Sequence, residues 1–353
     1  MSIDFDALTT TALSEAFPER RRIPGLAASL AGDADLRALA RRLAGATSCI
    51  TMLAGSGSRW VSSLAEAAAA GEDTGADPTA PRGLFPVQNA MPFGPDPIPI
   101  AAYALAAVRD LGRHIVVVRG WEREIEERIL APLAYPVGSW RFATQDAPGG
   151  KPRGHGDAAF QTMGEWSGSE YVIVNFGGDA SSPLTALSSL AVMDALARSL
   201  GDEAPGLLMP AAFVPAPAYP IALDGRGLPT RFGHAKLQGV APSTGAPSGG
   251  YTNVGVRVYR ASALRGAIER VRRDHWTAER GYAIPGNAPA PDDTFGGEFA
   301  LDNVDAMLAS EGRARLLCTA RPAELSPVKS LADLGRFERD SRIVCGDWAA
   351  LEG

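Results

Sequence analysis

Short apolar runs and amphipathic stretches alternate along the middle of this chain. The stretches with helical spacing predict helices, and the apolar runs between them predict buried strands. The expected strands cover residues 50–53, 114–118, 140–144, 171–176 and 206–214, and the expected helices cover 98–111, 121–130, 158–166 and 184–200. This alternation predicts an α/β fold with a mixed, mostly parallel sheet and helices on both of its faces. Ligands of such sheets bind beyond the carboxyl ends of the strands.

The pattern changes after residue 215. Short strands around Ile221 and Phe232 and a stronger strand at 253–259 predict antiparallel additions to the sheet. Further helices are expected at 262–273, 301–310 and 331–339, and one more strand is expected at 314–319.

The two ends of the chain and one internal stretch fall outside this alternation. Residues 1–46 have helical spacing and predict an N-terminal helical prefix on a main domain at 47–342, with 343–353 as a C-terminal tail. Residues 65–80 are rich in alanine, glycine and aspartate, which predicts a mobile surface loop.

Composition and charge narrow the classes of function. The 353 residues are 46% hydrophobic and 21% charged, an ordinary globular mix, and carry a formal net charge of −6. This acidic balance argues against a nucleic-acid partner but leaves room for a local basic pocket that binds a small phosphorylated ligand. Three scattered cysteines fit neither a disulfide framework nor a zinc site and favour a cytoplasmic location. The acidic N-terminus and the lack of an apolar run of about 20 residues predict no signal peptide and no membrane span.

Two segments combine a tight turn with a positive charge. In LAGSGSRW, residues 53–60, the glycines and serines at 55–58 predict a turn whose N–H groups can point at an anion, and Arg59 adds a cation. Such a turn also serves as a plain connection between strand and helix. In PRGLFPV, residues 81–87, Arg82 is either a cation of the site or an exposed arginine in a proline turn.

A carboxylate follows the strand expected at 171–176. That strand runs directly into Gly177, Gly178 and Asp179. Asp179 can hold Mg²⁺, which prefers oxygen ligands and bridges to substrate phosphates. Alternatively, it caps the helix that is expected to begin near Leu184.

The segment GHGDAAFQ, residues 154–161, opens an expected helix. A helix N-terminus offers backbone donors, and the small Gly154 and Gly156 would let a planar base approach the backbone. His155 is a candidate general base, although a histidine between two glycines can also simply shape the turn.

The order of these segments resembles that of the nucleotide-sugar pyrophosphorylases, also called sugar-1-phosphate nucleotidyltransferases. LAGSGSRW is similar to their signature Gly-x-Gly-Thr-Arg-Met, and PRGLFPV resembles their Pro-Lys-x-Leu-x-Pro-Val element with arginine in place of lysine. GHGD is similar to the base-binding loop of the UDP-sugar members. ELSPVKSLADLGRFER, residues 324–339, resembles the closing segment of bacterial N-acetylglucosamine-1-phosphate uridyltransferases. The resemblance implies a GT-A-like, Rossmann-like catalytic domain at 47–342.

The resemblance also implies a role for each matching residue. Arg59, Arg82 and Lys236 would be the catalytic cations that act on the triphosphate and the sugar phosphate. Asp179 matches the metal-binding aspartate and would hold Mg²⁺, the expected cofactor. Gln145 would read the base, and Asn253 and Glu298 would bind the sugar hydroxyls. The expected substrate-binding residues are Leu53, Ala54, Gly55, Gly57, Ser58, Gln145, Gly154, His155, Gly156, Asp157, Asn253 and Glu298.

Two positions depart from the family pattern. Lys329 stands where the closing segment has an asparagine as second metal ligand, so that it either removes a ligand or supplies a substitute charge. Asp302 and Asn303 are alternative candidates for the second metal ligand. The family's Gly-Tyr-Gly before the sugar site appears as Ala-Tyr-Pro at 218–220, which bears on sugar recognition.

The resemblance implies an enzyme that joins a nucleoside triphosphate, UTP in the first place, to a sugar 1-phosphate, and releases pyrophosphate. One alternative is a cytidylyl- or guanylyltransferase acting on another phosphorylated acceptor. A second is a non-catalytic nucleotide-sugar-binding regulator, which the departures from the pattern suggest. The expected partners are these small molecules, with no nucleic acid and no membrane, and a homo-oligomer is left open.

Overall fold

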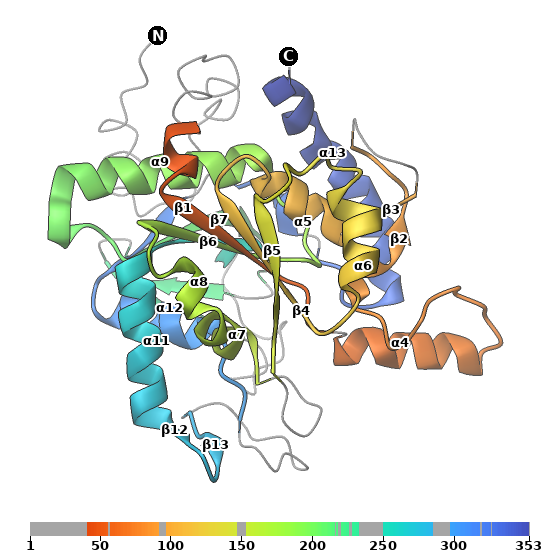
Figure 1. The fold of residues 1–353 in the computed structure, drawn as a ribbon, viewed down its shortest axis with the longest axis horizontal. Coiled ribbons are helices and arrows are strands. Elements are labelled where there is room, and N and C mark those ends of the chain that lie inside the picture. Colours follow the sequence, from red (N-terminus) through yellow and green to blue (C-terminus); the bar gives the residue numbers. More distant parts are fainter. Residues whose placement is uncertain are drawn as a thin grey trace.

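A ten-stranded mixed sheet runs through the centre of the computed structural model (Figure 1). Its strand order is β5-β4-β1-β6-β11-β7-β10-β8-β9, with β14 also paired to β7. The structure describes residues 41–55, 57–91, 97–146, 153–215, 217, 220–225, 228–232, 250–284, 297–317, 320–325 and 327–352. Within these residues the α/β fold with a mostly parallel sheet is confirmed, because β9, β10 and β11 run against the direction that the other seven strands share.

The first half of the sheet is parallel, and its three inner strands are deeply buried. It consists of β1 (Thr47–Met52), β4 (Arg113–Val118), β5 (Trp140–Thr144) and β6 (Tyr171–Phe176). Strand β1 lies in the middle, with Cys49 opposite His114 of β4 on one side and Ile173 of β6 on the other. These strands read as continuous apolar runs because helices cover both of their faces.

The second half of the sheet is mixed and contains antiparallel strands, as the sequence predicts. Its strands are β7 (Leu207–Val214), β8 (Pro220–Leu223), β9 (Pro229–Phe232), β10 (Gly250–Asn253), β11 (Val256–Arg260) and β14 (Ala314–Leu317). The single strand expected at 253–259 is wrong, because the chain leaves the ladder after Asn253 and re-enters it as β11 between β6 and β7. Two short ribbons complete the strands, β2 (Pro86–Val87) with β3 (Ile98–Pro99) and β12 (Trp276–Thr277) with β13 (Gly281–Tyr282).

Helices cover both faces of the sheet (Figure 1). Ile50 and Val174 contact a core formed with α7 (His155–Gln161), α8 (Met163–Trp166), α11 (Ala261–His275) and α12 (Leu301–Ser310). The opposite face contacts α4 (Ser58–Ala69), α5 (Ala101–Val108), α6 (Glu122–Ile125), α9 (Pro183–Leu200) and α13 (Leu334–Glu352). The split follows from the strand period, since successive side chains point to opposite faces.

Several expected boundaries differ from the structure. The helix expected at 98–111 is the shorter α5, Ala101–Val108, and the one expected at 158–166 is the pair α7 and α8, which begins at His155. The loop predicted at 65–80 is wrong over residues 65–69, where α4 continues because Leu64 and Ala67 are buried and alanine favours helix. The last helix, α13, runs to Glu352 rather than ending near Arg339, and Val344 is buried in it. Residues 1–40 of the expected prefix lie outside the described residues.

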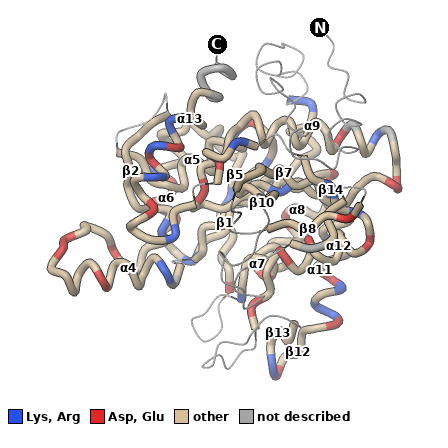
Figure 2. Tube along the Cα trace, turned by 180° about the vertical axis from the view of Figure 1, so that it is seen from behind, with Lys and Arg blue, Asp and Glu red and all other residues tan. Residues whose placement is uncertain are grey.

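Charges are mixed along the surface helices. Both basic and acidic residues occur on α11 and α13 (Figure 2). Among the described residues, no helix has both the length and the apolar character that crossing a bilayer requires.

Candidate functional site

Five segments that are distant in the sequence meet at the carboxyl ends of β1 and β6. The N–H of Gly177, just after β6, donates to the carbonyl of Met52 at the end of β1 over 3.1 Å. Arg82 lies against Gly57 and Gly178, and Gly255 lies against the carboxyl group of Asp179. The N–H of Val328 donates to the carbonyl of Gly178 over 2.9 Å and brings Lys329 to the same place. We call Arg82, Asp179, Arg257 and Lys329 the charged cluster.

Two glycines make room for the guanidinium group of Arg82. It begins the 3-10 turn Arg82–Leu84 and is partly exposed. A methyl group on Gly178 would collide with the Arg82 side chain, and one on Gly57 would lie 3.1 Å from Nη1. Gly57 also has a φ of +79°, which side chains disfavour. The guanidinium group of Arg82 therefore lies against two glycine-rich turns.

Asp179 does not cap the helix that follows it. Ser182 caps α9, and its hydroxyl oxygen accepts from the N–H groups of Leu184 and Thr185 at 3.1 and 3.3 Å. The buried Glu324 supports the same helix end by accepting from the N–H of Ser182 and from the hydroxyl of Thr185. The capping alternative is thus wrong, and the carboxylate of Asp179 stays with the charged cluster.

Opposing effects act on the carboxylate of Asp179. Burial raises its pKa above the ordinary value, and the positive charges of Lys329, Arg82 and Arg257 counteract that rise. Lys329 exerts the strongest of these charge effects. The charges that act on Asp179 are therefore those of three cations rather than those of other carboxylates.

Arg257 is already balanced by acidic residues behind the cluster. Its side chain is only 3% exposed and forms ion pairs of 2.8 Å with both Asp302 and Asp305. These carboxylates raise the pKa of Arg257 above its ordinary value against the effect of burial. Tyr259 donates to Asp305 over 2.6 Å, while burial raises the pKa of Asp305 to about 7. Arg257 thus links the α12 carboxylates to the site.

The donor set fits Mg²⁺ poorly. Asp179 is the cluster's single carboxylate, and its surroundings are cationic. Asp302, the expected substitute ligand, is engaged with Arg257, and the side chain of Asn303 accepts from the N–H of Ala300. Within the described ranges, no group of three His, Cys, Asp or Glu side chains could hold a metal ion. The expectation of Mg²⁺ stays a prediction, and these donors give it little support.

The predicted base-binding loop is tied to the segment before α12. The N–H of Gly156 donates to the carbonyl of Phe299 over 2.8 Å, and both Gly154 and Gly156 lie too close to Phe299 for a side chain. Their glycines are therefore needed for contact between two chain segments. His155 accepts at Nδ1 from the N–H of Leu301 over 2.8 Å, and its Nε2 lies 3.8 Å from Asp302.

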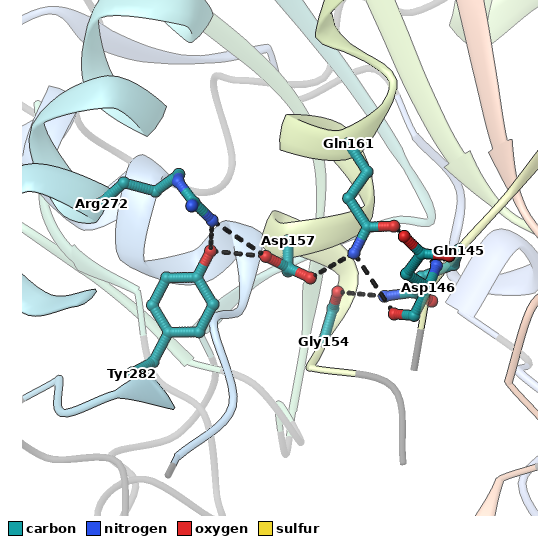
Figure 3. Close-up of polar contacts among 7 residues, drawn as sticks. All are labelled: Gln145, Asp146, Gly154, Asp157, Gln161, Arg272 and Tyr282. Carbon is teal, nitrogen blue, oxygen red and sulfur yellow. Dashed lines mark hydrogen bonds and ion pairs between the residues drawn. The ribbon is translucent and has the colours of Figure 1, made fainter. Parts of the chain in front are cut away.

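Asp157, the last residue of the GHGD segment, has several polar side-chain partners (Figure 3). It is buried and accepts from Tyr282 over 2.5 Å and from Gln161 over 2.6 Å, with Arg272 at 3.4 Å. The adjacent Gln145, also buried, donates to the carbonyl of Gly154 over 3.0 Å. These contacts use Asp157 and the amide N–H of Gln145 to hold the loop in place.

The other predicted substrate-binding residues are spread around the same edge. Leu53 is buried, Ala54 is half-buried, and Gly55 is exposed with open space beside it. Ser58 begins α4, and Arg59 is exposed in its first turn. Asn253, half-buried, ends β10 two residues before Gly255. Glu298 is exposed, with its Cγ beside Gly154. Lys236 lies outside the described residues.

Sequence reasoning missed Arg257, Gly178 and Gly255 as site residues. Arg257 had a readable signal, because an arginine between the apolar residues Val256 and Val258 of a strand is costly to bury without a partner. The two glycines had no such signal, since their role depends on side chains from other segments.

No protein-family model matches the chain, and a comparison with curated proteins finds no match. What the site can do is therefore inferred from its own residues. A partly exposed arginine and lysine beside one carboxylate, at the carboxyl end of a parallel sheet, are suited to a phosphorylated ligand.

Proposed function

We propose that this chain is a nucleotidyltransferase of GT-A-like, Rossmann-like fold that joins a nucleoside triphosphate, UTP in the first place, to a sugar 1-phosphate. The observation that carries the proposal is the meeting of Arg82, Asp179 and Lys329 at the ends of β1 and β6. In open α/β sheets that is where nucleotides bind.

The reaction requires positioning and charge neutralisation rather than a covalent intermediate. A phosphate oxygen of the sugar phosphate attacks the α-phosphorus of the nucleotide. The bond from that phosphorus to the bridging oxygen breaks, and pyrophosphate leaves with the electron pair. Arg82 would stabilise the negative charge that builds up on the leaving group, because a guanidinium group pairs with phosphate in a fixed, two-pronged geometry.

Recognition of the base and the sugar is assigned to the flanking loops. The GHGD turn and Gln145 would contact the base, while Asn253 and Glu298 would contact the sugar. Arg59 at the start of α4 and Lys236 are proposed to hold phosphate groups. None of these roles requires a general base. His155, the candidate for that task, accepts a backbone hydrogen bond at Nδ1.

Pyrophosphate release tests this proposal. The chain is incubated with each of the four nucleoside triphosphates and several sugar phosphates, with and without Mg²⁺. We expect turnover with UTP and at least one sugar 1-phosphate. Turnover with CTP or GTP and a different phosphorylated acceptor would favour the first alternative. Nucleotide-sugar binding without turnover over the whole panel would contradict the enzyme and favour a regulatory role.

Substitution of Arg82 gives the matched prediction. Arg82→Met should lower kcat/KM about 100-fold or more, the usual scale for losing a charge that stabilises a transition state, while Arg82→Lys retains part of the activity. The control is Arg123→Met, because Arg123 is 82% exposed on α6 and forms its ion pair with the exposed Glu127 of the helical turn that follows. Equal activity of Arg82→Met and Arg123→Met would remove Arg82 from the site.

A further inference from the structure

We propose that Lys329, together with Arg82, takes the charge-compensating place of a divalent cation at Asp179, so that the chain binds a triphosphate without Mg²⁺. The identity of the nucleotide rests on the proposed function, but the charge of the site does not. The ligand class is a linear polyphosphate, either free or as part of a nucleoside triphosphate.

The backbone holds Lys329 in position from both sides. On one side, the N–H of Val328 donates to the carbonyl of Gly178 over 2.9 Å, so that the residue before Lys329 is bonded to the residue before Asp179. On the other side, the N–H groups of Lys329 and Ser330 both donate to Asp333 over 2.9 Å. These hydrogen bonds fix the backbone of Lys329 beside Asp179.

The charge of the cluster favours an anion over a cation. Arg257 is buried and balanced by Asp302 and Asp305. Arg82 and Lys329, both partly exposed, act on the carboxylate of Asp179. A divalent cation that approaches Asp179 meets these two like charges, whereas a polyphosphate meets two cations. Asp179 is then a positioning residue that holds both cations at the sheet edge.

Each cation offers something that a metal ion would otherwise supply. The planar guanidinium group of Arg82, seated between Gly57 and Gly178, can contact two phosphate oxygens at once. The ammonium group of Lys329 is a compact point charge with three donors. Together they can neutralise adjacent phosphates in the way that a bridging Mg²⁺ does.

Calorimetric titration with UTP and with inorganic triphosphate tests this inference, each in EDTA and in Mg²⁺. The variants are Lys329→Asn and Lys329→Met, and the control is Arg339→Asn, which removes one positive charge from the 67% exposed Arg339 of α13. Circular dichroism confirms that every variant is folded.

We expect the wild type and Arg339→Asn to bind both anions in EDTA with a Kd within threefold of that in Mg²⁺. Lys329→Asn and Lys329→Met should bind at least tenfold more weakly in EDTA. Mg²⁺ should restore binding to Lys329→Asn, which regains an oxygen ligand beside Asp179, and not to Lys329→Met.

Three results would overturn the inference: at least tenfold loss of wild-type binding in EDTA, equal binding by Lys329→Met and Arg339→Asn, or no binding of either anion in either buffer. The proposed function fails separately. Binding of triphosphate in EDTA without release of pyrophosphate from any substrate pair would support the inference and contradict the nucleotidyltransferase.

Discussion

At the scale of single residues, the site depends on glycines that leave room for charged side chains. Gly178 and Gly57 border the guanidinium group of Arg82, and Gly255 borders the carboxyl group of Asp179. Each glycine comes from a different turn, so that three turns must close together for the two charges to sit side by side. A single methyl group is enough to disturb this arrangement.

Gly178→Ala should displace Arg82 and weaken binding of inorganic triphosphate at least tenfold, because the new methyl group would occupy the place of the guanidinium group. The overpacking should cost about 1–3 kcal/mol of stability. Gly164→Ala on α8 is the control, since a methyl group there meets open space. Calorimetry measures triphosphate binding, and urea unfolding measures stability. Unchanged triphosphate binding by Gly178→Ala would contradict the placement of Arg82 against Gly178.

His114 is a second residue of interest, because its burial determines its protonation state. It is fully buried in β4, its Nε2 is 2.9 Å from the carbonyl of Arg109, and its ring meets Tyr135 edge-on. Burial lowers the pKa of His114 from 6.5 to about 4. The folded chain therefore holds a neutral imidazole at a pH where the unfolded chain takes up a proton.

Because the folded pKa lies below the unfolded value, this stabilisation is complete above pH 6.5 and is lost as the pH falls toward 4. His114 should account for about 2 kcal/mol of lost stability between pH 6.5 and 5. His114→Gln, whose amide nitrogen can donate to the carbonyl of Arg109, should remove that part of the slope in urea unfolding. His275→Gln, at a position that is not buried, is the control. Identical pH slopes for the wild type and His114→Gln would contradict the buried neutral histidine.

At the scale of elements, the sequence pattern was sufficient for several elements. The spacing of apolar residues predicted β5, β6 and α12 with the bounds that the structure has. It missed the break between β10 and β11, where the chain changes its neighbouring strands, although Gly255 in that break was a signal for it. It also missed the end of α4, since alanine-rich polar segments are compatible with both loop and helix.

The same limit applies to the site. Chain order and turn chemistry placed Arg82 and Asp179 at strand ends, and the structure brings these two together. The tasks of Ser182, Glu324 and Arg257 could not be predicted, because they depend on partners far along the chain. The structural use of Gly154 and Gly156 against Phe299 likewise appears only when the two segments meet.

At the scale of the whole molecule, the parallel half of the sheet carries the site and the antiparallel half closes it. The turns after β1 and β6 contain Gly57 and Asp179, the junction of β10 and β11 contains Gly255, and the segment before α13 contains Lys329. Acidic and basic residues both occur on α11 and α13 (Figure 2). A small polyanion suits the two partly exposed cations of the charged cluster, Arg82 and Lys329.

The position of a bound triphosphate tests the central claim most directly. A crystal structure of the chain with a non-hydrolysable UTP analogue should show the phosphates in contact with the guanidinium group of Arg82 and the ammonium group of Lys329, beside Asp179. Phosphates bound elsewhere, with Arg82 and Lys329 in contact only with protein atoms, would contradict it.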